Sequence, residues 1–232
     1  MRYSTVLFDS DETLLDFKKS EREAIIGALS FSGVDATSEI IADYSEINKG
    51  LWKLLEKGEI KKDELKYKRF EVLFEKYGVK GDPKATANKY MELLSKRGYL
   101  LDGAREICER LSKKADLYIV TNGIKFIQKG RLADSGIVCY FKDIFISEDA
   151  GFDKPRVEFF EYVAGRIPSF SKENTLIVGD SLTSDIAGGI KYGIDTCWYN
   201  PKGEAAPTEI KDKITYTVSS YEEIYDLITK GE

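Results

Sequence analysis

Two aspartates one residue apart, Asp9 and Asp11, directly follow the apolar run 6–8. Such a run is typical of a buried strand, and in an open α/β sheet ligands bind beyond the carboxyl ends of the strands. Neighbouring carboxylates repel each other, and they stay ionised together when a cation or a lysine offsets their charge. The pair therefore indicates either a site for phosphate and metal chemistry or a turn whose side chains cap backbone groups.

Residues of the types that phosphate chemistry needs follow three later apolar runs: Thr121 after 117–120, Lys154 after 144–146, and Asp180 and Asp185 after 175–178. One carboxylate can attack phosphorus while a second transfers the proton, and a hydroxyl and a lysine can neutralise the phosphoryl oxygens. Mg²⁺ prefers hard oxygen ligands that it shares with phosphate, which matches Asp9 and Asp180. Together these residues predict a phosphoryl-transfer site with a carboxylate nucleophile.

The composition excludes several classes of function. None of the 232 residues is histidine, which removes phosphohistidine chemistry, Ser-His triads and most catalytic zinc sites. A net charge of −5 gives no reason to expect binding to duplex nucleic acid. No apolar run approaches the roughly 18 residues of a membrane span. Three widely spaced cysteines fit a reducing compartment, so we expect a cytoplasmic protein; its oligomeric state does not follow from the sequence.

The apolar periodicity changes along the chain. Residues 18–96 are predicted to be helical almost throughout, with helices at 21–32, 38–57, 62–77 and 83–97; Ser38 is the expected N-cap of the second. Strands then alternate with helices. The expected strands are 117–120, 144–146, 175–178, 196–199 and 214–218, and the helices are 104–113, 125–135, 156–166, 184–192 and 221–229.

This alternation predicts an α/β fold in which helices cover both faces of a doubly wound, Rossmann-like parallel sheet. Because the four early helices follow the first strand, we expect them to form a helical bundle inserted into the fold. The predicted division is a core domain at 1–15 and 98–232 and a helical cap domain at 16–97.

The chain resembles the haloacid dehalogenase-like (HAD) hydrolase superfamily over its whole length. The four motifs of that superfamily occur in order as Asp9-Ser10-Asp11-Glu12-Thr13, Val120-Thr121-Asn122-Gly123, Lys154-Pro155, and Gly179-Asp180-Ser181 with Asp185. Each motif alone is weak, but four in order at strand ends form a specific signal. The helical insert resembles the type called a C1 cap.

The resemblance implies a role for each motif residue. Asp9 would be the nucleophile, forming an aspartyl-phosphate, and Asp11 the general acid and base. Phosphate would be bound by Thr121, Asn122 and Lys154. Mg²⁺ would be held by Asp9, the main-chain carbonyl of Asp11 and Asp180, supported by Ser181 and Asp185 around it.

A narrower resemblance is to the YjjG-like pyrimidine 5′-nucleotidase group. It is carried by Asn48 to Trp52, by Glu59-Ile60 and Arg69-Phe70 in the insert, and by the segment 193–201 at the closing strand. It implies a phosphatase of nucleoside 5′-monophosphates whose substrate contacts Asn48, Trp52 and Arg69. Trp52 has a second interpretation, as part of the core of the bundle, because tryptophan is highly buried on average.

Two other functions use the same residue types. A phosphatase of small sugar phosphates or of phosphoglycolate would share the core and differ in the insert. A phosphoacceptor signalling domain also combines Asp, Thr, Lys and magnesium on a doubly wound sheet, although it needs no helical insert. The preferred base, sugar or ester does not follow from the sequence.

Overall fold

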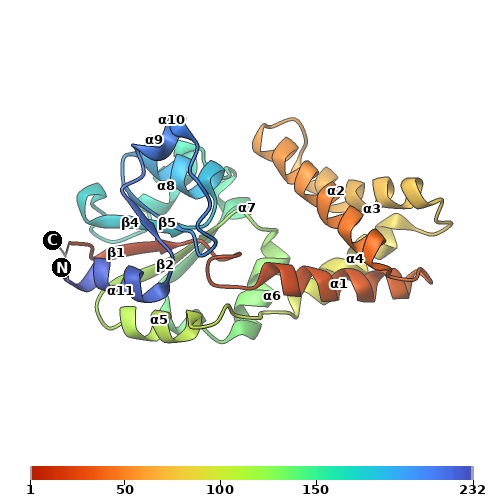
Figure 1. The fold of residues 1–232 in the computed structure, drawn as a ribbon, viewed down its shortest axis with the longest axis horizontal. Coiled ribbons are helices and arrows are strands. Elements are labelled where there is room, and N and C mark those ends of the chain that lie inside the picture. Colours follow the sequence, from red (N-terminus) through yellow and green to blue (C-terminus); the bar gives the residue numbers. More distant parts are fainter. Residues whose placement is uncertain (1, 231–232) are drawn as a thin grey trace. The chain divides into compact units, whose positions relative to one another are not determined.

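The computed structural model describes residues 2–230, and the chain divides into two compact units (Figure 1). Of the described residues, the first unit contains 2–16, 99–125 and 135–230, and the second contains 17–98 and 126–134. The predicted cap segment thus forms nearly all of the second unit, which also includes a later stretch of helix.

The first unit is built on a six-stranded parallel sheet in the order β3-β2-β1-β4-β5-β6. Its strands are β1 (Thr5–Phe8), β2 (Asp116–Thr121), β3 (Asp143–Ile146), β4 (Thr175–Gly179), β5 (Asp195–Tyr199) and β6 (Tyr216–Val218). The predicted doubly wound α/β fold is confirmed. The strand order reverses between β1 and β4, and ligands bind at such switch points.

Helices cover both faces of this sheet, as Figure 1 shows. One face packs on α5 (Ala104–Leu111) and α11 (Tyr221–Lys230), the other on α8 (Val157–Ala164) and α9 (Ala187–Tyr192). Successive side chains of a strand alternate between the two cores: Val6 and Phe8 belong to the first and Leu7 to the second. Two short helices, α7 (Ser147–Ala150) and α10 (Thr208–Lys211), complete the connections.

Four helices make up most of the second unit: α1 (Phe17–Phe31), α2 (Ser38–Glu56), α3 (Lys62–Tyr77) and α4 (Pro83–Ser95). Tyr44, Phe70 and Tyr90 form its aromatic centre, with ring centroids 5.3–5.5 Å apart. The predicted N-cap of α2 was wrong by one residue. Thr37 has the extended backbone of a cap and its side chain accepts from the N–H of Ile40, whereas Ser38 already belongs to the helix.

Helix α6 (Lys125–Ser135) contributes its middle, residues 126–134, to the second unit. Gly130 allows α6 to pack closely against Ser95 at the end of α4, because a Cβ at this position would lie 2.4 Å from the carbonyl oxygen of Ser95. Hydrogen bonds join the same segments: the Gly98 N–H donates to Asp134 at 2.8 Å, and Arg131 donates to the Arg97 carbonyl at 3.2 Å. The end of the predicted cap segment is therefore fixed to α6.

Among residues 2–230, no helix combines the length and the apolar character needed to cross a membrane.

Candidate active site

Asp9 lies directly beyond β1, and the sheet itself positions it. Its backbone N–H donates to the carbonyl of Val178 on the neighbouring strand at 2.9 Å. The chain then turns sharply: the N–H of Leu14 donates to the carbonyl of Ser10 at 2.9 Å, and Glu12 adopts a positive φ of 58°. This turn holds Asp11 near Asp9. Burial is the main cause that raises the pKa of Asp9, and the charge of Asp11 adds to it.

Lys154 is the centre of the site. Its side chain is 1% exposed, and its Nζ donates to Asp9 Oδ1 at 2.7 Å, to Asp185 Oδ1 at 2.7 Å and to the Val120 carbonyl at 2.6 Å. An ammonium group has three donors, and all three are used. Segments far apart in the sequence therefore meet at one buried charge.

Asp185 lies on a π-helical turn, Leu182–Ile186, that follows β4. Its side chain is fully buried; Oδ1 accepts from Lys154, and Oδ2 accepts from the Ser181 N–H at 3.1 Å. Gly179 makes room for it, because a Cβ there would lie only 2.3 Å from Oδ2 of Asp185. Since both carboxylate oxygens already accept hydrogen bonds, Asp185 is better suited to positioning other groups than to binding a metal directly.

The second motif is also closely connected to Lys154. The Asn122 side chain donates to the Lys154 carbonyl and accepts from the Lys154 N–H, both at 2.8 Å. Thr121 is buried, and its hydroxyl accepts from Ser10 at 3.0 Å and from the Gly123 N–H at 3.3 Å. Asn122 thus fixes the backbone of the lysine, while Thr121 joins the end of β2 to the turn after β1.

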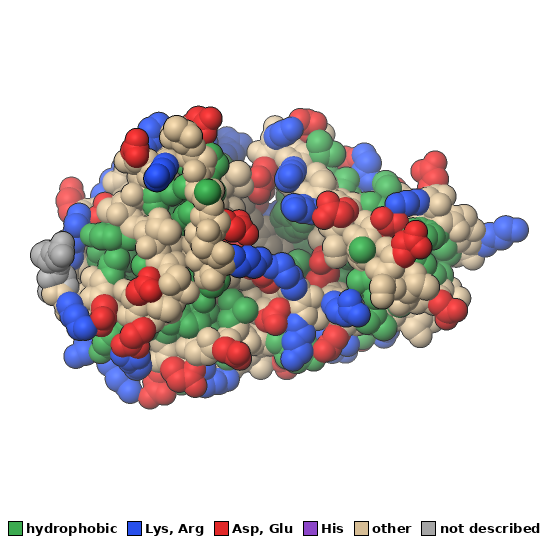
Figure 2. Space-filling model, in the orientation of Figure 1, with side chains coloured by type: hydrophobic (Ala, Val, Ile, Leu, Met, Phe, Trp, Pro, Cys, Tyr) green, Lys and Arg blue, Asp and Glu red, His purple; other side chains and the backbone are tan. Residues whose placement is uncertain are grey.

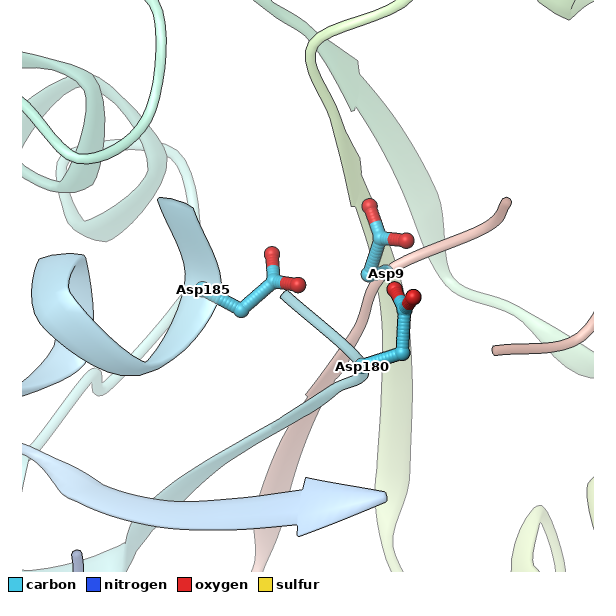
Figure 3. A group of neighbouring side chains, drawn as sticks. All are labelled: Asp9, Asp180 and Asp185. Atoms are coloured by element: carbon cyan, nitrogen blue, oxygen red, sulfur yellow. The ribbon is translucent and has the colours of Figure 1, made fainter. Parts of the chain in front are cut away.

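Asp180 follows β4 and completes an acidic group with Asp9 and Asp185, whose ligand oxygens all lie within 4.8 Å of one another. Figure 3 shows Asp185 pointing from its helical turn toward the carboxylates of Asp9 and Asp180. Thr13 fixes Asp180 from the first turn: its hydroxyl accepts from the Asp180 N–H at 3.1 Å and lies 3.5 Å from Oδ1. The two aspartate-bearing loops are therefore joined.

The charges of this site are unbalanced. Burial raises the pKa of Asp9 well above its usual value, and the neighbouring carboxylates raise it further. Lys154 lowers this pKa, but by less than the other groups raise it. Burial, with help from Asp185, raises the pKa of Asp180 to about 7. For Lys154, burial lowers the pKa, but Asp185 and Asp9 outweigh it, so the pKa lies above its ordinary value and the ammonium stays charged.

The acidic group suits a hard divalent cation. Carboxylate oxygens are the ligands that Mg²⁺ prefers. Burial, and after it the neighbouring carboxylates, raises the pKa values of Asp9 and Asp180 although Lys154 lowers them, so the charged carboxylates need more positive charge than Lys154 supplies. A cation beside Asp9 and Asp180 would supply the missing positive charge. The donor set lacks histidine and thiolate, which argues against zinc or a softer metal.

The three insert residues predicted to touch substrate lie in different environments. Asn48 and Arg69 are 4% and 2% exposed, and they bond inside the second unit: Arg69 donates to Asn48 at 3.2 Å, and Asn48 donates to Glu21 at 2.7 Å. The Arg69 guanidinium also lies 4.5 Å from the Tyr90 ring centre. Trp52 is half-buried. Substrate contact by these three residues stays a prediction.

One face of the described residues carries both signs of charge. Figure 2 shows lysine and arginine side chains intermingled with aspartate and glutamate over one face of the described residues. On this face, the charges do not form the stripe of one sign that is typical of a surface that binds duplex nucleic acid.

Sequence reasoning missed two groups that hold the site. Ser10 bonds Thr121, and the indole of Trp198 on β5 donates to the Asp180 carbonyl at 2.9 Å. Ser10 lies within the first motif, but the motif pattern leaves its position open. Trp198 lay in a predicted strand, and strand periodicity does not say which atom its indole N–H reaches.

Comparison with known proteins agrees with this geometry. Residues 3–193 match the haloacid dehalogenase-like hydrolase family. The HAD-hydrolase YfnB of Bacillus subtilis is 44% identical over 98% of this chain and 96% of its own, and the pyrimidine 5′-nucleotidase PynA of Streptococcus pneumoniae is 43% identical over 100% and 97%. The pyrimidine 5′-nucleotidase YjjG of Escherichia coli is 32% identical over 99% and 100%.

A crystal structure of YfnB bound to magnesium, in a form that reveals interdomain movement, superposes with a TM-score of 0.92 over 99% of this chain and 100% of that one. The family match covers most of the sheet and all four motifs, and the similarity to YfnB, PynA and YjjG extends over nearly the whole chain. The chain belongs to the haloacid dehalogenase-like hydrolase family.

Proposed function

We propose that this hydrolase is a magnesium-dependent phosphatase of nucleoside 5′-monophosphates that acts through an aspartyl-phosphate on Asp9. The observation that carries the proposal is the position of Asp9 beside both Lys154, at 2.7 Å, and Asp180, within 4.8 Å. A carboxylate between a fixed ammonium group and a second carboxylate suits attack on a phosphoryl group.

In the first step, a carboxylate oxygen of Asp9 attacks phosphorus and the bond from phosphorus to the ester oxygen breaks. Asp11, protonated, gives its proton to the departing alkoxide, so the nucleoside leaves as an alcohol. Lys154 and the Thr121 hydroxyl stabilise the charge on the phosphoryl oxygens. Asn122 keeps the Lys154 backbone in place through its two hydrogen bonds at 2.8 Å.

In the second step, Asp11, now a carboxylate, takes a proton from water. The hydroxide attacks phosphorus, the bond to Asp9 breaks, and inorganic phosphate leaves. Asp9 returns as a carboxylate and Asp11 is again protonated, so the cycle balances.

Magnesium, when bound, supplies positive charge that offsets the phosphoryl oxygens and helps align them for in-line attack. Asp9, Asp180 and the main-chain carbonyl of Asp11 would hold it. Ser181 and Asp185 would support these ligands, because the Ser181 N–H and the Asp185 carboxylate already bond each other at 3.1 Å.

Support for a nucleotide substrate comes from relatives. PynA and YjjG are pyrimidine 5′-nucleotidases by name, and both align over nearly the whole chain, including the insert. Of the three insert residues in the predicted contact, Trp52 has the most accessible surface, whereas Asn48 and Arg69 are nearly inaccessible. Trp52 is therefore the strongest candidate to stack on a base.

The phosphatase of small sugar phosphates or of phosphoglycolate remains the alternative, since the core residues select a phosphoryl group and not a base. The signalling alternative fits less well, because the matched family is one of hydrolases. A small phosphorylated metabolite is thus the proposed partner. The free state of Cys108, Cys139 and Cys197 supports the proposed cytoplasmic location.

A substrate panel tests the proposal. The purified chain would be incubated with MgCl₂ and pyrimidine and purine 5′-monophosphates, ribose 5-phosphate, glyceraldehyde 3-phosphate or phosphoglycolate, and phosphate release would be measured. We expect the highest kcat/KM for a nucleotide, loss of activity in EDTA, and no activity for Asp9→Asn. A higher kcat/KM for a sugar phosphate would favour the alternative, and a single phosphorylation without turnover would favour a signalling domain.

A further inference from the structure

Trp198 connects the sheet to the acidic group through one hydrogen bond. Its indole Nε1 donates to the main-chain carbonyl of Asp180 at 2.9 Å. On the proposed function of this site, we infer that Trp198 is a positioning residue that fixes Asp180 for metal binding. This role belongs to the side chain of Trp198 and comes in addition to packing.

Asp180 needs such a contact because the sheet ends just before it. Gly179 is the last residue of β4 and pairs with Trp198 on β5, so the peptide groups of Asp180 lie beyond the ladder. Side chains replace the missing strand bonds: Thr13 accepts from the Asp180 N–H at 3.1 Å, and Trp198 donates to its carbonyl. Both polar groups of the Asp180 backbone are thus held by side chains from other segments.

A closed circuit of contacts includes this bond. Tyr199, next to Trp198 on β5, stacks on Tyr221 of α11 with ring centroids 5.0 Å apart. The Tyr221 hydroxyl donates to the Thr13 carbonyl at 2.8 Å, and the Thr13 hydroxyl bonds the Asp180 N–H. The circuit returns to β5 through Trp198, and it joins the loop of Asp11 to the loop of Asp180.

The indole N–H has a direct consequence for the ligand oxygens. Because Thr13 bonds the Asp180 N–H and Trp198 bonds the Asp180 carbonyl, the Asp180 carboxylate stays near Asp9 before any ion binds. Partners that orient a metal ligand in this way typically change metal affinity about 10- to 100-fold when they are lost. A phenylalanine at 198 keeps an aromatic ring and removes the donor.

The test compares Trp198→Phe with Tyr118→Phe in the full-length protein. Both wild-type residues are 4% exposed and lie on strands of the sheet. Trp198→Phe removes the N–H donor together with part of the ring, and Tyr118→Phe removes a hydroxyl from a buried ring on the same sheet, so the melting temperature reports the packing cost of each change. Mg²⁺ affinity would be measured by calorimetry without substrate, alongside melting temperature. We expect about a 10-fold higher Kd for Trp198→Phe, unchanged affinity for Tyr118→Phe, and kcat of Trp198→Phe partly restored at high Mg²⁺.

Unchanged Mg²⁺ affinity in a folded Trp198→Phe variant, even with a lower melting temperature, would overturn the inference and leave a packing role. Failure of the wild-type chain to bind Mg²⁺ would instead overturn the proposed function. A second measurement keeps the wild-type residue. In Trp52→Phe, selective excitation of tryptophan reports on Trp198 alone of the chain's two tryptophans, and the positive charge of Mg²⁺ at Asp180 should shift its emission. Constant emission while calorimetry records binding would count against the inference.

Discussion

Lys154 donates to a carboxylate that is wholly shielded from solvent: its Nζ lies 2.7 Å from Oδ1 of Asp185, whose side chain is 0% exposed. Removing one partner of a buried ion pair leaves the other charge uncompensated, at a cost of about 3–5 kcal/mol. We therefore expect Lys154→Met to lower the free energy of unfolding by about that amount at pH 8 in EDTA. Urea denaturation would measure it.

The free energy of unfolding that Lys154→Met loses should be smaller at pH 5 than at pH 8. Lys154 lowers the pKa of Asp9, so removing Lys154 raises that pKa further. A carboxylate whose pKa is higher in the folded protein than in the unfolded chain destabilises the fold at high pH, and this destabilisation disappears as the pH falls and the carboxylate is protonated. Lys142→Met is the matched control, because Lys142 pairs with Asp116 at 3.5 Å on the surface. It should change stability by less than about 1 kcal/mol. Equal losses for the two variants would show that the buried lysine is not needed for charge balance.

Asp9→Asn should abolish turnover and leave the fold intact. Burial raises the pKa of Asp9, so an uncharged amide is easier to bury, and Lys154 keeps its bonds to Asp185 and Val120. Phosphate release and melting temperature would be measured together. Asp195→Asn is the control at the opposite end of the sheet, where Asp195 begins β5 and bonds Arg2 at 2.7 Å. Near-normal activity of purified Asp9→Asn would exclude the covalent mechanism.

Asp11→Asn should slow the hydrolysis of alkyl phosphates by about 10²–10⁴-fold, the usual contribution of general acid–base catalysis. An aryl phosphate has a leaving group that departs without a proton, so its first step should be partly spared. The burst of phenol released from an aryl phosphate would be compared with steady-state hydrolysis of a nucleotide. If both substrates slow by the same factor, Asp11 is not the acid.

Asp180 makes Mg²⁺ binding sensitive to pH. Because the pKa of Asp180 is about 7, the metal-free carboxylate is protonated below that pH, and Mg²⁺ must displace a proton to bind. Affinity should therefore fall as the pH drops from 8 to 6, with proton release on binding visible by calorimetry in buffers of different ionisation heat. An affinity that stays constant over this range would contradict a titrating Asp180.

The same raised pKa predicts a stability effect. Between the ordinary carboxylate pKa of 3.8 and about 7, the folded protein binds the proton more tightly than the unfolded chain, so metal-free stability is lost as the pH rises through this window. Asp180→Asn should hence be more stable than the wild type at pH 8 in EDTA, by about 1–4 kcal/mol, while losing Mg²⁺ affinity.

Trp52→Ala separates the two interpretations of the insert tryptophan. Base–aromatic stacking is worth about 1–3 kcal/mol, so KM for a nucleotide should rise about 5- to 150-fold while hydrolysis of a base-free phosphate barely changes. A lower melting temperature with equal losses for both substrates would assign Trp52 to the bundle core. Asn48→Ala is the comparison for packing, because Asn48 bonds Glu21 and Arg69 in the interior.

The parts of the site that follow a strict spacing were predictable from the sequence. Asp9 and Asp180 come directly after buried strands, and parallel strands bring their carboxyl ends to one edge. The limits of α3 were predicted correctly and those of α2 to within one residue, since apolar periodicity and a closing glycine mark them, whereas α1 begins four residues before its predicted start.

Contacts between distant segments were not predictable. Nothing local to Trp198 indicates that its N–H reaches Asp180, and nothing in 126–134 indicates that this stretch joins the helical unit. Both depend on how elements meet in three dimensions. The predicted N-cap of α2 was wrong by one residue because threonine and serine are both good caps, and only the backbone angles show that Thr37, and not Ser38, is the cap.

The close approach of Asp185 to Gly179 has a consequence for mutagenesis of the protein. The space that its missing Cβ leaves is filled by the Asp185 carboxylate, so any replacement would displace the partner of Lys154. A saturation mutagenesis screen scored on activity should therefore rank this glycine with the aspartates as intolerant of every substitution. A reader of such a screen would take it for a reactive residue, although it has no side chain with which to react.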